Sequence, residues 1–554
     1  MNGFVILLVA LVLFFVAYVT YGAWLCKQWG VDPKRKTPAV VNNDGGDYVP
    51  TSTAVLLGHH FASIAGAGPI TGPINAAFFG WVPVFLWVVI GGIFFGGVQD
   101  FSALFASIRH DGKTIGEVIE HHIGHKCKVI FNIFVYLVLL LVVAAFSDIV
   151  AGTFASVPAA DTEIAMANAR SAGSVATASM CFIPLAVLFG LLQRRNHHLA
   201  VNTVIGVALL CGSIALGLAF PLMNVSKGFW LSITFVYIFI ASVAPVWILL
   251  QPRDYLNSFL LYAIIILSVV GIGAARPDMT LPAFTGFVVK GQPLFPVLFI
   301  TIACGAISGF HSLIASGTTS KQLRNEGDAK LVGYGGMLIE CALAVIALVA
   351  VGSVRGQELA GAGSGPAAIF SKGIASFAAV IGLPETTTAT VIALAYSAFC
   401  LTSLDSATRL GRMIFQEMFE GFAPSVSKVL GNKYVATAIT IGLSAALTGA
   451  GYQNIWPLFG AANQLVAVPA FLACAVWFKH IGRSNRMFLF PMFFMLAATM
   501  SSLALSFYNN VMKLTAGTGA LVKEGLQCVI IVPVVVLAPI ITVDGLKALR
   551  AKKS

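Results

Sequence analysis

The sequence predicts an all-α polytopic membrane protein, and three observations support this fold class. Hydrophobic residues fill 58% of the 554 positions and charged residues only 10%, whereas a soluble domain carries about 25% charge. The apolar residues fall in runs of roughly 18–25, the length that crosses about 30 Å of hydrocarbon. Lys and Arg recur in alternate gaps between these runs, as expected for loops on one side of a membrane.

About fifteen runs are long enough to be spans. They lie near 3–25, 52–79, 81–108, 129–152, 174–192, 199–222, 229–250, 257–275, 295–318, 331–353, 386–408, 434–451, 455–478, 487–508 and 525–546. Most of the 33 Lys and Arg residues lie in the gaps that face the cytoplasm when the N-terminus is outside, so the positive-inside rule predicts an outside N-terminus and a cytoplasmic C-terminus. The net charge of +11 is therefore a topology signal, and the expected partner is membrane lipid rather than nucleic acid.

The second span contains a cluster of residues that break helices. Gly66, Gly68, Pro69, Gly72 and Pro73 lie near its middle, where Pro removes backbone donors and Gly adds conformational freedom. Unwound backbone at membrane depth is tolerated only where protein or a watery cavity satisfies it. A kink is the simpler alternative, but this density of Gly and Pro favours a discontinuous helix.

A weaker interruption in the seventh span, at Ser242–Pro245, suggests an inverted repeat. Spans 2–6 and 7–11 would then form two five-helix halves that each begin with a broken helix, which is typical of secondary transporters with a midplane site. The predicted division is an N-terminal helix and cytoplasmic loop (1–51), a first half (52–222), a second half (229–410) and accessory helices (411–554).

The break predicts where a substrate binds. If a second half-helix starts near Thr71–Pro73, its free N–H groups and positive dipole end suit a carboxylate, and the carbonyl groups around Ser63–Gly68 suit a cation. The predicted substrate-binding residues are Gly66, Gly68, Pro69, Thr71, Gly72 and Ser242.

Polar residues inside the predicted spans are candidates for ion or proton coupling. The predicted coupling residues are His59, His60, Asp100, Ser316, Thr318 and Thr319. The His pair could handle protons or simply hold the broken segment by hydrogen bonds, and the hydroxyl groups could ligate sodium beside Gly66 or knit helices together. Asp405 has a simpler interpretation as the i,i+4 partner of Arg409. No cofactor is predicted beyond a coupling Na⁺ or H⁺.

A histidine-rich segment between the third and fourth spans, His110–His125, has metal-ligand spacing at Glu117, His121 and His125. A solvated amphipathic helix accounts for the same pattern, and no metal site is predicted.

Three stretches resemble the carbon starvation protein A (CstA) family. They are GHHFASIAGAGPI at Gly58–Ile70, which continues to GWVP at Gly80–Pro83, GGIFFGGVQDF at Gly91–Phe101 and SGTTSKQL at Ser316–Leu323. The resemblance implies a transporter of the bacterial inner membrane that imports peptides or pyruvate when carbon is scarce. It also implies the leucine-transporter-like fold of the amino acid–polyamine–organocation group.

We therefore expect a secondary active transporter that imports small peptides by alternating access around the broken helix. The alternative is a proton- or sodium-coupled pyruvate symporter of the same fold. A channel would need a continuous polar pore, whereas this sequence shows clustered helix breaks. A membrane-embedded enzyme is less favoured because the sequence has no nucleotide-binding loop and no zinc-protease motif.

Overall fold

The computed structural model describes residues 2–158, 162–195, 199–245, 247–361, 364–419, 423–449 and 451–551. The first helices are α1 (Gly3–Val19), α2 (Tyr21–Trp29), α3 (Pro38–Val41), α4 (Thr53–Ile64), α5 (Gly68–Ala76), α6 (Trp81–Gly91), α7 (Gly97–Arg109), α8 (Ile115–His122), α9 (His125–Phe154), α10 (Glu163–Arg195), α11 (Leu199–Ala219) and α12 (Lys227–Val243). The later ones are α13 (Leu250–Ala275), α14 (Leu294–Ile302), α15 (Gly309–Gly317), α16 (Gly336–Gly352), α17 (Val354–Gly361), α18 (Pro366–Ala379), α19 (Glu385–Met418), α20 (Pro424–Leu430), α21 (Lys433–Thr448), α22 (Tyr452–His480), α23 (Arg486–Thr515) and α24 (Leu526–Arg550). Two short strands, β1 (Val288–Val289) and β2 (Gln292–Pro293), form a hairpin.

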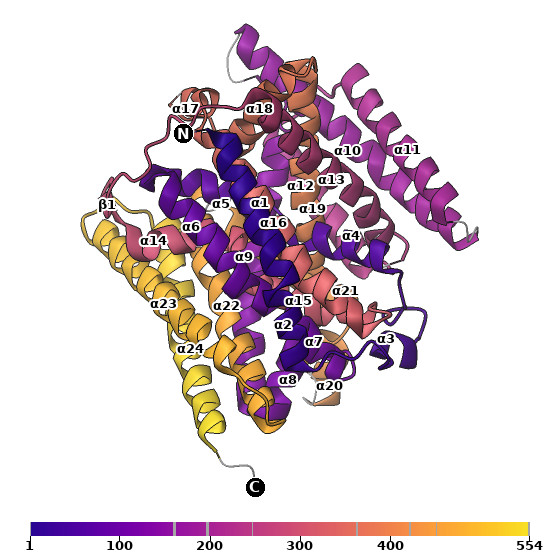
Figure 1. Cartoon of the computed structure of the whole chain (residues 1–554), viewed down its shortest axis with the longest axis vertical. Coiled ribbons are helices and arrows are strands. Elements are labelled where there is room, and N and C mark those ends of the chain that lie inside the picture. The colour runs from indigo at the N-terminus through magenta and orange to yellow at the C-terminus, as the bar shows by residue number, and fades with distance from the viewer. Residues whose placement is uncertain are drawn as a thin grey trace.

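The helices form one elongated bundle. α1 begins at the upper end, near α17 and α18, whereas α8 and α20 lie at the lower end (Figure 1). Within the described residues, 12 helical stretches are long and apolar enough to cross a membrane, and three shorter apolar helices, α4, α12 and α21, accompany them. The chain is therefore a multi-pass, all-α membrane protein, as the sequence predicts.

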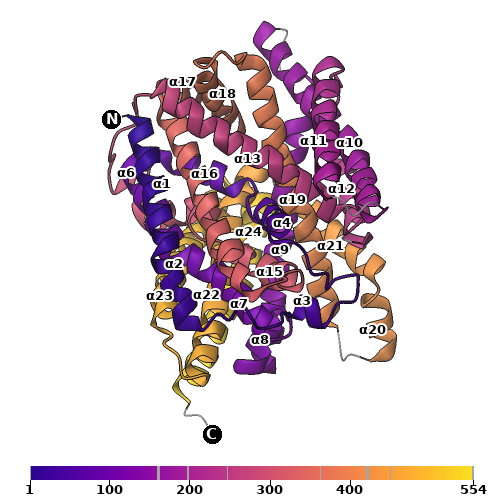
Figure 2. The same ribbon diagram turned by 45° about the vertical axis from the view of Figure 1, so that its right-hand side comes forward.

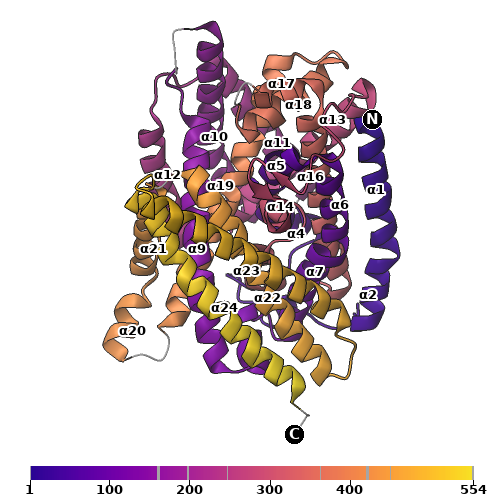
Figure 3. The ribbon, with the colours of Figure 1, turned by 90° about the vertical axis from the view of Figure 1, so that its left-hand side faces the viewer.

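Burial varies greatly among these stretches. The apolar window of Ile455–His480 is entirely buried, whereas only 33% of the apolar window is buried in each of Gly3–Trp29 and Lys523–Arg550. α1 lies along one side of the bundle (Figure 2), and α23 and α24 run across another side (Figure 3). α10 and α11 pair at a third side (Figure 1). Exposed apolar side chains on these peripheral helices suit contact with lipid, which leaves α4, α5, α15, α16 and α22 as the interior.

The second predicted span is interrupted, as the Gly/Pro cluster predicts. α4 ends at Ile64 and α5 begins at Gly68, with Ala65–Ala67 outside either helix. Pro69 lies in the first turn of α5, where its missing N–H costs no hydrogen bond. The expectation that the second half-helix starts near Thr71–Pro73 is wrong by about one turn, because the N–H of Thr71 already donates to the Ala67 carbonyl oxygen.

A second interruption lies between α14 and α15, in the predicted span 295–318. Ala303 adopts a positive φ of 42°, and regular helix resumes only at Gly309. Side chains of neighbouring helices satisfy the released backbone groups. The amide of Gln99 donates to the Ser308 carbonyl oxygen at 2.7 Å, and the N–H of Phe310 donates to Asn463 at 2.8 Å.

The weaker interruption predicted at Ser242–Pro245 coincides with the end of a helix. α12 stops at Val243, and the next helix, α13, begins at Leu250. Arg409 donates to the carbonyl oxygen of Ala244 at 3.2 Å, which ties this turn to α19. The predicted seventh span is thus one short helix followed by a turn, and the helix does not resume within it.

Candidate functional site

The two interruptions cross in the interior of the bundle. A Cβ atom added at Gly68 would lie 2.7 Å from the Cys304 sulfur, and one added at Gly72 would lie 2.3 Å from the Ile302 carbonyl oxygen. Both positions are buried. The missing side chains therefore allow α5 to approach the α14–α15 interruption at backbone distance, which is the reason for glycine at these two positions.

The predicted substrate-binding residues fall into two groups. Gly66, Gly68, Pro69, Thr71 and Gly72 are all buried at the first interruption. The hydroxyl group of Thr71 lies 3.0 Å from that of Tyr396 on α19. Ser242, by contrast, lies on α12 with its hydroxyl group 3.4 Å from that of Thr437 on α21.

A buried ionic network begins at His59. Its Nδ1 lies 3.1 Å from Oδ2 of Asp254, and Asp254 Oδ1 accepts from Arg253 Nη2 at 2.7 Å. Arg253 also pairs with Asp405, and Tyr237 donates to Asp405 at 2.7 Å. All five side chains except that of Tyr237 are nearly inaccessible to solvent. The expected pairing of Asp405 with Arg409 is wrong, because Arg409 pairs with Asp47 at 3.3 Å.

A second buried ionic network surrounds His311. Nδ1 of His311 lies 2.9 Å from Asp100 Oδ2, and Nε2 lies 3.5 Å from Glu340 Oε2. None of the three side chains is exposed. Of these, only Asp100 is predicted as a coupling residue. His311 and Glu340 come from α15 and α16, and an ionisable residue within an apolar run is the signal that could have identified both.

The remaining predicted coupling residues lie on α4, on α15 and in the turn that follows α15. His60 Nδ1 lies 2.8 Å from the Thr319 hydroxyl group, and the Ser316 hydroxyl group donates to its own helix at the Ser312 carbonyl oxygen. The carbonyl oxygen released at Ser63 accepts from Ser403 on α19 at 3.2 Å. The hydroxyl group that contacts the C-terminal end of α4 therefore belongs to Ser403 on α19. The predicted sodium site would instead have placed the hydroxyl groups of Thr318 and Thr319 beside Gly66.

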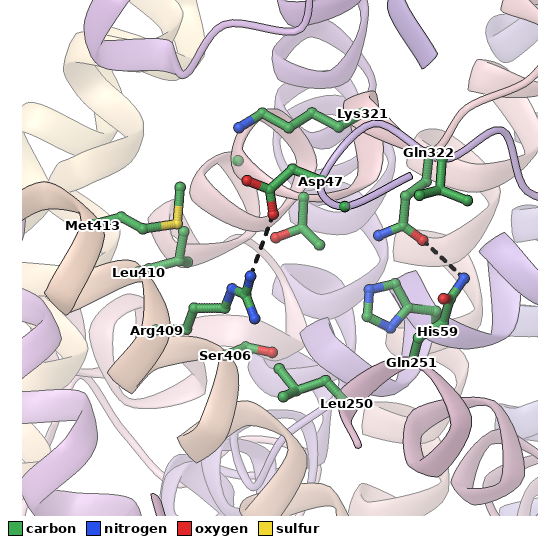
Figure 4. A pocket seen from close by; sticks show the side chains of 14 residues that line it. Asp47, His59, Leu250, Gln251, Lys321, Gln322, Ser406, Arg409, Leu410 and Met413 are labelled. Carbon is green, nitrogen blue, oxygen red and sulfur yellow. Dashed lines mark hydrogen bonds and ion pairs between the residues drawn. The ribbon is translucent and has the colours of Figure 1, made fainter. Parts of the chain in front are cut away.

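A small pocket lies below the first interruption, at the lower end of the bundle. His59, Thr318 and Ser406 line it, and the Arg409–Asp47 ion pair lies across it, opposite the Gln251–Gln322 hydrogen bond of 3.5 Å (Figure 4). Its volume is about 30 Å³, which holds water but no substrate. We therefore interpret this end of the described chain as closed to a substrate.

The upper end is open. One cavity of about 540 Å³ reaches Tyr396, the partner of Thr71, and a second of about 560 Å³ is lined by Asn75 near the C-terminal end of α5 and by Thr301 on α14. Pro366 at the start of α18 lines both cavities. Their sizes fall within the roughly 300–1,000 Å³ of small-molecule sites.

Two interrupted helices cross inside the bundle, buried ionic networks lie beside them, and the cavities at the two ends are unequal. These features together are those of a membrane transporter. The chain belongs to the carbon starvation protein CstA family, whose model matches residues 2–360 and 353–502.

Characterised relatives cover most of the chain. The Escherichia coli peptide transporter CstA is 33% identical over 86% of this chain and 76% of its own length. The Helicobacter pylori peptide transporter CstA is 34% identical over 90% of this chain and 80% of its own. The Escherichia coli pyruvate/proton symporter BtsT is 32% identical over 90% of this chain and 80% of its own. The family is one of transporters, so the chain is not an enzyme.

Solved structures share the fold at low sequence identity. A mutant of the Eremococcus coleocola manganese transporter superposes with a TM-score of 0.52 at 10% identity, over 92% of this chain and 99% of that one. The same transporter in complex with an aromatic bis-isothiourea substituted compound gives 0.50 at 12% identity, over 92% and 98% of the two chains. This likeness shows that the bundle shares the overall fold of that manganese transporter, which is leucine-transporter-like.

Proposed function

We propose that this chain is a secondary active transporter that imports small peptides across the bacterial inner membrane during carbon starvation, driven by protons. Import proceeds by alternating access around the α4–α5 interruption. The observation that carries the proposal is the unequal access to the two interrupted helices: spacious from the upper end, closed at the Arg409–Asp47 pair below. With the N-terminus outside, this is an outward-facing arrangement.

The polar lining of the upper cavities supports a peptide substrate. The first cavity contains Asp148, ion-paired with Lys227 at 2.8 Å, and Lys372, and the second contains Lys513 and Glu524. A peptide carries an ammonium group and a carboxylate, so it finds a partner of opposite charge for each end. The first turn of α5, at Gly68, then receives the carboxylate at the interruption.

Charge balance supports coupling to protons. The His59 network holds one Arg and two carboxylates, and the His311 network holds two carboxylates and one imidazole. With the carboxylates ionised, the His59 network has one negative charge more than Arg253 neutralises, and the His311 network has one more than a protonated His311 would neutralise. An uncompensated buried charge is costly. A proton on His59 removes the surplus of the first network. Because His59 also lines the lower pocket, it is placed to release that proton to the cytoplasm.

The transport core follows from the packing of the interrupted helices. In this proposal the 12 long apolar stretches of the described residues and the three shorter apolar helices all serve as membrane spans. The division into halves 52–222 and 229–410 stays a prediction. The contacts between helices favour a different assignment of helices to the two halves. α5 packs on α14, α9 on α19 and α12 on α21, while α13 packs on α4 as α22 packs on α15. We therefore pair α4–α7, α9, α12 and α13 with α14–α16, α19, α21 and α22, and take the α10–α11 pair as an insertion.

Pyruvate is the second candidate substrate. The space at the interruption itself is small, since added Cβ atoms at Gly66, Gly68 and Gly72 would all collide with neighbours. The N–H groups at the start of α5 suit a monocarboxylate as well as a peptide terminus, and one relative is named a pyruvate/proton symporter.

Uptake by reconstituted vesicles separates these possibilities. We expect labelled di- and tripeptides to accumulate when the outside is acid, with saturation and counterflow, and unlabelled pyruvate to compete poorly. Accumulation of pyruvate without peptide uptake selects the second candidate. Uptake driven by a sodium gradient alone refutes proton coupling. Absence of uptake of either substrate under both gradients refutes the proposed function.

A further inference from the structure

Four histidines gather at the lower end of the bundle, apart from both ionic networks. His110 caps the C-terminal end of α7, His121 and His122 form the last turn of α8, and His480 ends α22. Rings of neighbouring members lie edge-on, with the centroids of His110 and His122 5.0 Å apart and those of His121 and His122 4.7 Å apart. Three separate helices thus bring these imidazoles together.

This group differs from the set that the sequence spacing suggests. α8 ends at His122, and the chain turns at Gly124 with a φ of 136°, so His125 does not continue the helix face that holds His121. His125 instead pairs with Glu120 at 2.6 Å. His110, twelve residues before His122, replaces it in the group.

The hydrogen bonds of His110 fix which of its nitrogens is free. Its Nδ1 lies 2.7 Å from the carbonyl oxygen of Ala106. Because a carbonyl oxygen only accepts, Nδ1 carries the hydrogen and Nε2 presents a lone pair. Donation of the other ring N–H to a backbone carbonyl is the usual arrangement of a metal-binding imidazole. The free Nε2 of His110 points at Nε2 of His122, 2.8 Å away.

His122 lies between two other imidazoles. Its Nδ1 lies 3.4 Å from Nδ1 of His480, on the side opposite its contact with His110. Burial, followed by the charges of the neighbouring imidazoles, lowers the pKa of His122 to about 3. Burial also lowers the pKa of His110. Imidazole binds metal in its neutral form.

We propose that His110, His121 and His122 bind one divalent transition-metal ion of the zinc class, with His480 as a positioning residue. One ligand atom of each of the three lies within 4.8 Å of the others. Nitrogens bound to tetrahedral zinc at about 2.0–2.1 Å lie about 3.3 Å apart. To reach this spacing, Nε2 of His110 and Nε2 of His122 must separate by about 0.5 Å from their 2.8 Å contact, and the exposed His121 must rotate toward them. The exposure of His121 leaves the fourth position to water.

His480 acts through His122 rather than on the metal. When Nδ1–H of His122 donates to His480, Nε2 of His122 presents a lone pair toward Nε2 of His110. The metal then takes the place of the hydrogen that otherwise lies between these two nitrogens. The bound ion joins the end of α7 to α8 and, through His480, to α22.

Zn²⁺ binding to the purified full-length protein in detergent tests the site. We expect one Zn²⁺ per chain by elemental analysis after dialysis, and calorimetric binding that His110→Ala and His122→Ala abolish. His480→Ala should weaken binding by about 10–100-fold, as loss of a supporting partner does. His125→Ala is the matched control, because His125 lies in the same segment and pairs with Glu120, and it should bind like the unmodified chain.

His121→Ala keeps the test decisive if His110→Ala and His122→Ala fold poorly, because His121 is exposed on the last turn of α8. We expect it to lower Zn²⁺ affinity at least tenfold while the metal-free thermal unfolding temperature stays unchanged. Equal affinity in the unmodified chain, His121→Ala and His125→Ala overturns the proposal. So does the absence of stoichiometric Zn²⁺ in the unmodified chain.

Discussion

Gly72→Ala tests the close approach of the two interrupted helices. The added Cβ would lie 2.3 Å from the carbonyl oxygen of Ile302 and 2.8 Å from its carbonyl carbon. Both atoms belong to backbone that no side-chain rotation can move. Inserting a methyl group into a packed core costs about 1–3 kcal/mol, and a backbone collision belongs at the upper end of that range. The helix preference of Ala over Gly offsets up to about 1 kcal/mol, so we expect a net loss of about 2 kcal/mol.

Gly212→Ala is the control for this substitution. Gly212 lies on α11, and nothing lies within 4 Å of an added Cβ there. The helix preference acts alone at this position, so the control should gain up to about 1 kcal/mol. Thermal unfolding of both variants in detergent gives the stability, and vesicle uptake gives the activity. If Gly72→Ala unfolds and transports like Gly212→Ala, then α5 and α14 do not meet as described and the proposed site is misplaced.

Three further changes have defined outcomes. Asp100→Asn should abolish acid-driven accumulation in vesicles and preserve counterflow, and retained acid stimulation would exclude the His311 network from coupling. Arg253→Met leaves its two buried carboxylate partners uncompensated and should cost about 3–5 kcal/mol in thermal unfolding, with partial rescue by Asp405→Asn. The N–H groups of Gly46 and of the next two residues lower the pKa of the Asp44 carboxyl below 3.8. Because the pKa of Asp44 is lowered in the folded state, its carboxylate stays ionised at about pH 5, and these three amides should remain protected from hydrogen exchange there. Protection should decline only as the pH falls through the lowered pKa. Loss of protection near neutral pH would contradict this.

The two interruptions differ in how well the sequence predicts them, and the difference is chemical. At the first, Pro69 and the neighbouring glycines disfavour a continuous helix by themselves, so local sequence is enough. At the second, α14 ends without a proline, and the released backbone groups are satisfied by Gln99 and Asn463 from α7 and α22. The sequence suggests a further interruption near Asn463 and Gln464. That interpretation is wrong, because α22 is continuous there and both amides serve the α14–α15 interruption.

The ionic networks show the same limit for charged residues. Apolar surroundings are enough to single out His59 and Asp100 as candidates. Their partners, Asp254 and His311, lie 195 and 211 residues further along the chain, and no local spacing connects them. Where local spacing is used for Asp405 and Arg409, it predicts the wrong pair, because the two side chains leave α19 toward different neighbours.

The closed lower end is held by weak contacts, as alternating access requires. The Arg409–Asp47 pair spans 3.3 Å, with 52% of the Asp47 side chain exposed, and exposed ion pairs contribute about 0–1 kcal/mol. The Gln251–Gln322 hydrogen bond is long at 3.5 Å. Two conformations that interconvert during transport differ by only a few kcal/mol, so a fully buried ion pair in this position would hold the end closed. The strong, desolvated ion pairs lie deeper, beside His59. In the proposed mechanism, the costly ion pairs therefore lie where the coupling proton would bind, and the proposed exit is held by contacts that one protonation event would outweigh.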